Sequence, residues 1–149
     1  MSKALLKSAF TVGLLVLLMS VPVYGASVNK SIKIDAGSES DGATTVNGSI
    51  SVGEGAKVSG TLRTVNGKIR VGNDARIEGA ETVNGSLLLA ANVSAANLTT
   101  VNGAVSVGQS SSVDGEIEAV NGAITLEQDS RVRRNVSNVN GDMEFSGSE

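Results

Sequence analysis

The side chains that could do chemistry in this chain are carboxylates, hydroxyls and a regularly spaced set of carboxamides. The chain contains no histidine and no cysteine, which removes the usual general base, the thiol nucleophile and most transition-metal ligands. Glu116 and Glu118 are separated by a single residue, so on a strand both carboxylates point to the same side. A solvent-facing strand lacks the cleft and desolvation that catalytic acids need. The sequence therefore predicts no enzyme, no metal and no cofactor.

The carboxamides belong to a repeat that runs through most of the chain. The tetrapeptide Thr-Val-Asn-Gly occupies 45–48, 64–67, 82–85 and 100–103, and looser copies occupy 119–122 and 138–141. A further copy at 27–30 carries Lys30 in place of glycine. The repeated asparagines are Asn29, Asn47, Asn66, Asn84, Asn102, Asn121 and Asn140. The interval between successive asparagines is always 18 or 19, which indicates a repeat fold in which each unit is one turn.

Within one unit the polarity alternates with period 2, which is typical of short strands with one buried face. Small or apolar residues alternate with polar ones from Val46 to Val52, and again from Ala56 to Leu62, on either side of a turn at 53–55. Strands this short cannot fold back on themselves, so each must pair with its copy one unit further on. The sequence predicts an all-β, parallel β-solenoid of about seven coils, spaced by about 4.8 Å.

The Asn-Gly steps are predicted to be corners of the coil. Asn and Gly take positive φ more readily than other residues, so we expect the chain to turn there. The predicted corner glycines are Gly48, Gly67, Gly85, Gly103, Gly122 and Gly141. Stacked coils would bring the seven asparagines into a ladder of side-chain hydrogen bonds. Ligand binding by these amides is the alternative, but a ladder would already use their hydrogen bonds.

Stacking also predicts pairs of charged side chains. Arg63 should lie one coil below Glu81, and Asp114 one coil below Arg133. Exposed pairs of this kind contribute about 0–1 kcal/mol, so we expect them to favour the register more than the stability.

Residues 1–25 are typical of a secretory signal. Lys3 and Lys7 precede an apolar segment at 10–19, and Pro22 follows it. The alternative, a membrane anchor, normally needs about 20 apolar residues. We predict a signal peptide at 1–25, a solenoid domain at 26–145 and a flexible tail at 146–149, with export to the periplasm, the cell envelope or the medium. The net charge of −3 argues against a nucleic-acid partner, and a chain without cysteine has no disulfides.

Two groups of bacterial solenoids resemble the repeat. Residues 52–62, Val-Gly-Glu-Gly-Ala-Lys-Val-Ser-Gly-Thr-Leu, resemble the coils of bactofilins, which are polymer-forming cytoskeletal β-helices. The recurring Thr-Val-Asn-Gly-x-Ile pattern resembles adhesin-like β-solenoids of the cell envelope. The resemblance covers 27–145 and implies a right-handed β-helix that assembles end to end. Apolar residues six apart, as at Val46, Val52 and Val58, are similar to left-handed hexapeptide-repeat enzymes. Those enzymes depend on histidine, so the right-handed form is preferred.

The leading hypothesis is a non-enzymatic exported protein that acts as an envelope scaffold, an adhesin-like module or a polymer-forming unit. Its expected partner is a second copy placed end to end, an envelope protein or a polysaccharide. Charged residues near the start of the solenoid should resist stacking. Met143 and Phe145, near its end, are the predicted end-to-end contact residues.

Two other functions compete with this hypothesis. The first is binding of ice or another ordered surface by an exposed column of Thr45, Thr64, Thr82 and Thr100 beside the asparagines. Its simpler explanation is that β-branched threonine suits a strand. The second is a sugar-cleaving β-helix enzyme, which would need a long loop or an added domain to wall a groove.

Overall fold

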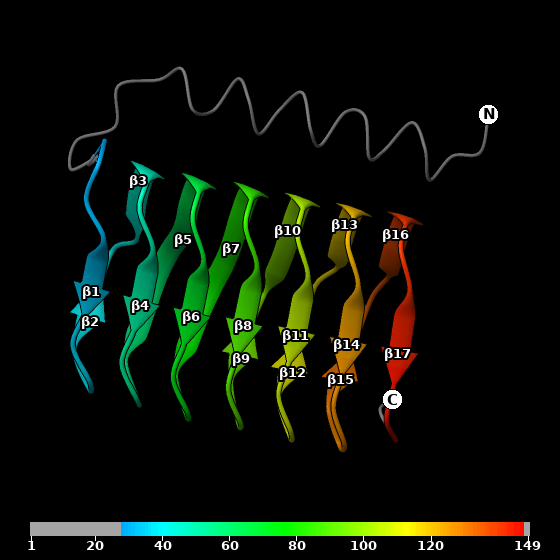
Figure 1. The fold of residues 1–149 in the computed structure, drawn as a ribbon. Coiled ribbons are helices and arrows are strands. Elements are labelled where there is room, and N and C mark those ends of the chain that lie inside the picture. Colours follow the sequence, from blue (N-terminus) through cyan, green and yellow to red (C-terminus); the bar gives the residue numbers. More distant parts are fainter. Residues whose placement is uncertain (1–27, 148–149) are drawn as a thin grey trace.

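Short parallel strands, stacked turn upon turn, make up the described part of the chain (Figure 1). The structure is a computed structural model that describes residues 28–147. Within that range it contains seventeen strands and no helix. The predicted signal peptide at 1–25 and the last two residues of the predicted tail lie outside the described residues.

The strands form two sheets in which every pair is parallel. The seven-stranded sheet follows the order β1 (Ile32–Ile34), β4 (Ile50–Val52), β6 (Ile69–Val71), β8 (Leu87–Leu89), β11 (Val105–Val107), β14 (Ile124–Leu126) and β17 (Met143–Phe145). The ten-stranded sheet contains β2 (Glu39–Ser40), β3 (Ala43–Asn47), β5 (Lys57–Asn66), β7 (Arg76–Asn84), β9 (Ser94–Ala95), β10 (Asn97–Asn102), β12 (Ser112–Val113), β13 (Ile117–Asn121), β15 (Arg131–Val132) and β16 (Val136–Asn140).

Each turn passes once through the seven-stranded sheet and then along two segments of the ten-stranded sheet. Strands β1, β2 and β3 make the first turn, at the blue end in Figure 1, and β14, β15 and β16 make the sixth. Strand β17, in red, begins a seventh turn. The predicted parallel β-solenoid is confirmed, with about six turns rather than seven.

Aliphatic side chains fill the interior in columns that run from turn to turn. Leu62, Ala80 and Leu98 occupy one position in three successive turns, and all three are fully buried. A buried leucine or isoleucine stabilises the fold by about 1.5–3 kcal/mol relative to an exposed one. The column continues with Leu98 on Ile117, so an apolar side chain fills the same interior position in each of these turns.

One corner explains why the interval between equivalent residues is 18 in some turns and 19 in others. Val58 pairs with Ile77, and Leu62 pairs with Ala80. Strand β5 therefore contains one residue more than β7 between these paired positions. The extra residue forms a β-bulge, which lets one strand contain a residue that its neighbour lacks. The register places the same insertion before Ile117 in another long turn. The variable residue is therefore confined to one corner, and all other columns stay in phase.

Candidate functional site

The asparagine side chains form a continuous ladder along one corner of the rod. In each step the Nδ2 of one asparagine donates to the Oδ1 of the asparagine one turn before it. The six N···O distances, which join Asn29, Asn47, Asn66, Asn84, Asn102, Asn121 and Asn140, lie between 2.8 and 3.0 Å. The ladder therefore has a direction. Within residues 28–147, the ladder leaves the Nδ2 of Asn29 without an acceptor at one end and the Oδ1 of Asn140 without a donor at the other.

The glycine that follows six of the seven ladder asparagines is required by close approach between turns. The sequence prediction of positive φ at this corner is wrong for all seven asparagines and for Gly48, Gly67, Gly85 and Gly103, and only Gly122 and Gly141 have it. A Cβ on Gly85 would overlap the backbone carbonyl oxygen of Gly67, and a Cβ on Gly103 would overlap that of Gly85. Backbone lies directly on backbone at this corner, so any side chain would push the turns apart.

Left-handed backbone is found at a different corner, midway between successive ladder asparagines. Its residues, with φ between 57° and 66°, are Gly37, Gly55, Asp74, Asn92, Ser110 and Asp129. A Cβ at Gly37 or Gly55 would have nothing within 4 Å. Gly, Asn and Asp tolerate this conformation best, and an open corner lets other residues occupy it. This column was missed at the sequence level, although small polar turn residues recur there.

The four repeated threonines lie inside the rod, which corrects the prediction that they form an exposed column. Thr45, Thr64, Thr82 and Thr100 have no exposed surface. Each hydroxyl donates to a backbone carbonyl one turn earlier, as in the 2.9 Å bond from Thr45 Oγ1 to the Lys30 oxygen. A satisfied hydroxyl can be buried, and Val46 is turned outward instead. The threonines cannot meet an ice surface, so the predicted Thr-x-Asn array reduces to a single column of asparagines.

Both predicted charge pairs are present, one on the ten-stranded sheet and one in the bends that follow β12 and β15. Arg63 Nε lies 3.0 Å from Glu81 Oε2, and both side chains are about a quarter exposed, at 24% and 25%. Arg133 Nε lies 3.2 Å from Asp114 Oδ1 at a more exposed position. Such pairs favour the correct register, because a slip along the strand would separate the opposite charges.

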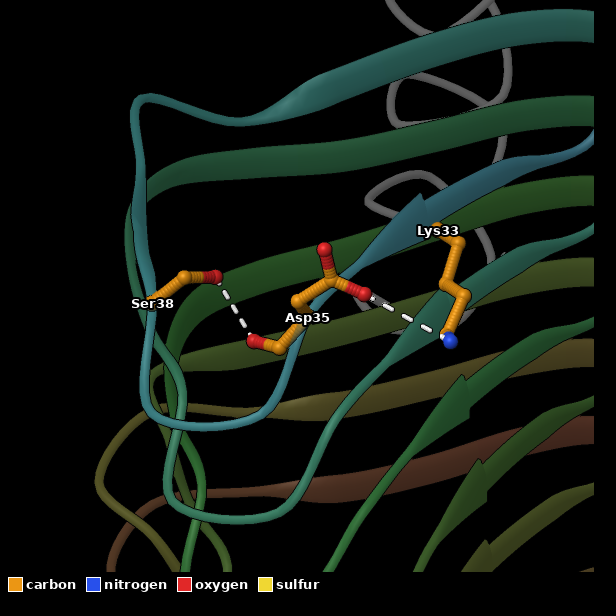
Figure 2. A network of polar contacts seen from close by, with 3 residues as sticks. All are labelled: Lys33, Asp35 and Ser38. Carbon is orange, nitrogen blue, oxygen red and sulfur yellow. Dashed lines mark hydrogen bonds and ion pairs between the residues drawn. The ribbon is translucent and has the colours of Figure 1, made fainter.

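The N-terminal end of the rod is charged and closed to a further turn. Lys30 occupies the position that is glycine in the later turns. At this position a Cβ points at the backbone carbonyl of the turn beneath, and a Cβ on Gly48 would overlap the carbonyl oxygen of Lys30. Figure 2 shows the polar contacts of the same turn. Lys33 Nζ lies 3.5 Å from Asp35 Oδ1, and Ser38 Oγ donates to the Asp35 backbone oxygen at 2.6 Å. Another chain stacked beneath in register would collide with Lys30.

The C-terminal end has an open sheet edge, as the N-terminal end has at β1, and it adds two exposed apolar side chains on its last strand. Met143 and Phe145 of β17 are 46% and 51% exposed. Strands β16 and β17 are the last in their sheets and pair along one edge only. Within residues 28–147, nothing donates to the Asn140 Oδ1 and nothing accepts from the Gly141 N–H. This end therefore carries the predicted contact residues Met143 and Phe145 together with an open sheet edge.

Asn138 is the one described residue with a buried, unpaired side-chain atom. It takes the place of the repeated threonine in the last full turn. Its Nδ2 donates to the Gly122 carbonyl at 2.7 Å, but its Oδ1 has no partner. We expect Asn138→Thr to raise the free energy of unfolding by about 1 kcal/mol, because it removes the unpaired oxygen. Urea unfolding measures this, and Asn138→Leu, which lacks any donor for Gly122, should not reproduce the gain.

A shallow hollow of about 310 Å³ lies near the N-terminal end, lined by Glu39, Ser40, Asp41, Lys57 and Ser59. Its groups contact one another: Lys57 Nζ lies 3.8 Å from Glu39 Oε1, and Ser59 Oγ donates to Asp41 Oδ1 at 3.4 Å. Glu39 and Lys57 are largely exposed. Such side chains keep their water, so the hollow does not provide the desolvated environment of a catalytic site.

Residues 28–147 were considered for metal-binding groups and for membrane-spanning helices. No group of three or more acidic side chains there converges in a way that could hold a metal ion. The same residues contain no helix of the length and apolarity needed to cross a bilayer.

Comparison with known proteins gives no match for this chain among family models, curated proteins or solved structures. The β-solenoid fold is established by the repeat and the strand register.

Proposed function

We propose that this protein is an exported, non-enzymatic structural rod that makes its contacts through its C-terminal end, with a second copy of itself as the partner. The observation that carries the proposal is the difference between the two ends. The C-terminal end offers half-exposed Met143 and Phe145 beside an open sheet edge. The N-terminal end presents Lys30 where stacking requires glycine.

The sides of the rod favour a structural role over a binding face. Its backbone groups bond from turn to turn, and its corner amides bond to one another. A surface that has used its directional groups internally has few left for a specific ligand. The signal-like residues 1–25 support export, and the resemblance to bactofilin and adhesin-like coils supports a scaffold of the cell envelope.

Lys30 favours a finite assembly over an open filament. A filament built head to tail would set Lys30 of one copy above Gly141 of the next, where the corner has no room for a Cβ. A pair joined by two C-terminal ends avoids this contact. Such a pair is closed by two-fold symmetry, so it stops at two copies.

Charge at the C-terminal end fits a two-fold pair. Asp142 and Glu144 lie at the end of the seven-stranded sheet, and Arg131 and Arg133 lie at or beside β15 of the ten-stranded sheet. Strand β17 begins a level that β15 does not reach. A two-fold axis can set β17 of each copy over β15 of the other. Each β17 then covers the level that the partner's β15 leaves open, and acidic side chains come close to basic ones.

Sedimentation velocity on the chain lacking residues 1–25, over a range of concentrations, tests the proposal. We expect the mass to double and then stay constant. Phe145→Lys should raise the dissociation constant at least about tenfold, because it places a charge in the buried centre of the contact.

The matched control is Val28→Lys, which adds the same charge to an exposed apolar side chain at the opposite end, where Val28 is 61% exposed. This variant should dimerise as the parent does. Filaments of unlimited length, a monomer at every concentration, or equal effects of the two lysines would each contradict pairing through the C-terminal end.

A further inference from the structure

The six Asn-Gly steps of the repeat are chemically identical, but one of them lies in a different environment. We infer that Asn140 is a site of spontaneous self-modification, in which its side-chain amide is lost by reaction with the Gly141 nitrogen, while the ladder protects the interior copies. The inference does not depend on the proposed function.

The reaction needs only water. The backbone nitrogen of the glycine loses its proton and attacks Cγ of the preceding asparagine. A C–N bond forms, the Cγ–Nδ2 bond breaks, and Nδ2 leaves as ammonia, which gives a five-membered succinimide. Water then opens either ring C–N bond, so the product is aspartate or isoaspartate with a new carboxylate. Glycine offers the least hindered nitrogen because it has no Cβ.

In the interior turns, both reacting groups are held by hydrogen bonds. Gly67, Gly85, Gly103 and Gly122 each donate their N–H to the backbone oxygen of the ladder asparagine one turn further on, at 2.9–3.2 Å. The asparagine before each of them donates through Nδ2 and accepts through Oδ1 in the ladder. Attack requires the carboxamide to rotate over its own backbone, which would break both ladder bonds and the N–H bond.

At Asn140 most of these restraints are missing. Its Nδ2 donates to Asn121 Oδ1 at 3.0 Å, but within residues 28–147 its own Oδ1 has no donor and the Gly141 N–H has no acceptor. Asn47 is intermediate: ladder bonds hold its carboxamide on both sides, while the Gly48 N–H makes no described bond. Among the ladder asparagines that precede a glycine, Asn140 is thus the one whose carboxamide is held by a single ladder bond and whose following N–H has no acceptor within residues 28–147.

The modification would change the C-terminal end. A carboxylate cannot donate to Asn121 Oδ1, so the last ladder bond is lost and two acceptors face each other. The new negative charge lies beside Asp142 and Glu144. An isoaspartate also adds a backbone carbon between 140 and 141, which moves β17 out of register with β14. Its pairing of Met143 with Ile124 would then be lost.

The test is peptide mapping by mass spectrometry of the chain incubated at mildly alkaline pH and at low concentration, so that no second copy covers the end. Asn140 should deamidate at least about tenfold faster than Asn66, Asn84, Asn102 and Asn121, because each extra hydrogen bond that must break slows the reaction severalfold. Asn47 should be slower than Asn140. In denaturant, the six steps should react at similar rates. Equal rates in the folded chain would overturn the inference.

A lengthened chain separates position from local sequence. Repeating the segment 129–147 directly after Gly147, in place of 148–149, adds one further turn of the longer kind in register. Asn140 would then gain a ladder donor above it and an acceptor for the Gly141 N–H. Its rate should fall to that of the interior copies, and the asparagine of the added turn should become the fastest. If Asn140 stays fast in a lengthened chain that folds, as judged by circular dichroism, local sequence is the cause and the inference is wrong.

Discussion

Gly85→Ala is expected to lower the free energy of unfolding by about 3 kcal/mol, although the backbone of Gly85 is not left-handed. A Cβ at this position would overlap the carbonyl oxygen of Gly67 in the turn before it. The same oxygen accepts from Thr82 Oγ1 at 3.3 Å, and the neighbouring ladder bond joins Asn84 to Asn66. Lifting the turn to relieve the overlap would weaken all of these bonds. Thermal unfolding should show a melting temperature lower by about 10 °C.

Gly55→Ala is the matched control, because Gly55 differs from Gly85 both in its backbone conformation and in the space available for a Cβ. Gly55 has φ +66°, but a Cβ there would have nothing within 4 Å. We expect a loss of about 1 kcal/mol, the usual cost of left-handed backbone for a residue with a side chain. Asp74 and Asn92 already adopt this conformation in later turns. If Gly55→Ala proved more damaging than Gly85→Ala, close approach between turns would not be the reason for the glycine column.

The fold and the ladder could be predicted because repetition converts sequence spacing into spatial position. Once equivalent positions of successive repeats are stacked, Asn66 must lie on Asn47, and Arg63 must lie beneath Glu81. Both contacts are present, at 2.8 Å and 3.0 Å. No assumption about the shape of a single turn is needed for either. For this reason, the spacing of one residue type is sufficient to predict the ladder.

Which residues point into the core beside the ladder corner could not be predicted from polarity alone. A binary pattern treats Thr45 as polar and Val46 as apolar, and therefore places the valine inside. The structure does the opposite, because the Thr45 hydroxyl reaches the Lys30 carbonyl and is satisfied when buried. The partner lies one turn away, so no local pattern reveals it.

The position of left-handed backbone was predicted at the wrong corner for a related reason. Asn-Gly is a strong local signal for positive φ, but here Asn serves the ladder and Gly serves the contact between turns. The true left-handed column mixes residue types such as Gly55, Asp74 and Ser110. Such a column is visible only when equivalent positions are compared across turns. Local propensity therefore identifies the Asn-Gly steps as special positions, but it assigns them the wrong role.

Deleting the segment 67–84 is expected to leave a folded rod that is one turn shorter. The deletion joins Asn66 to Gly85 and removes one complete repeat, since Asn66 and Asn84 are successive members of the ladder. Strand β8 would then lie on β4, with Leu87 above Ile50, and Leu98 would lie on Leu62 in the core. Each turn contacts only its neighbours, so the remaining interfaces are of the same kind as before. Circular dichroism should keep its sheet signal, and scattering should show a rod shorter by about 4.8 Å.

Deleting the segment 67–75 removes only half of that repeat and should do far more damage. Arg76 would follow Asn66 directly, so a segment of the ten-stranded sheet would occupy the position of β6 in the seven-stranded sheet. The turns above would still match one another, but their columns would be displaced from those below by half a turn. Apolar side chains would lose their partners at that boundary, and the two short stacks could not share a core. We expect loss of cooperative unfolding and of most sheet signal. Equal stability of the two deletion variants would mean that the alignment of turns does not hold this fold together.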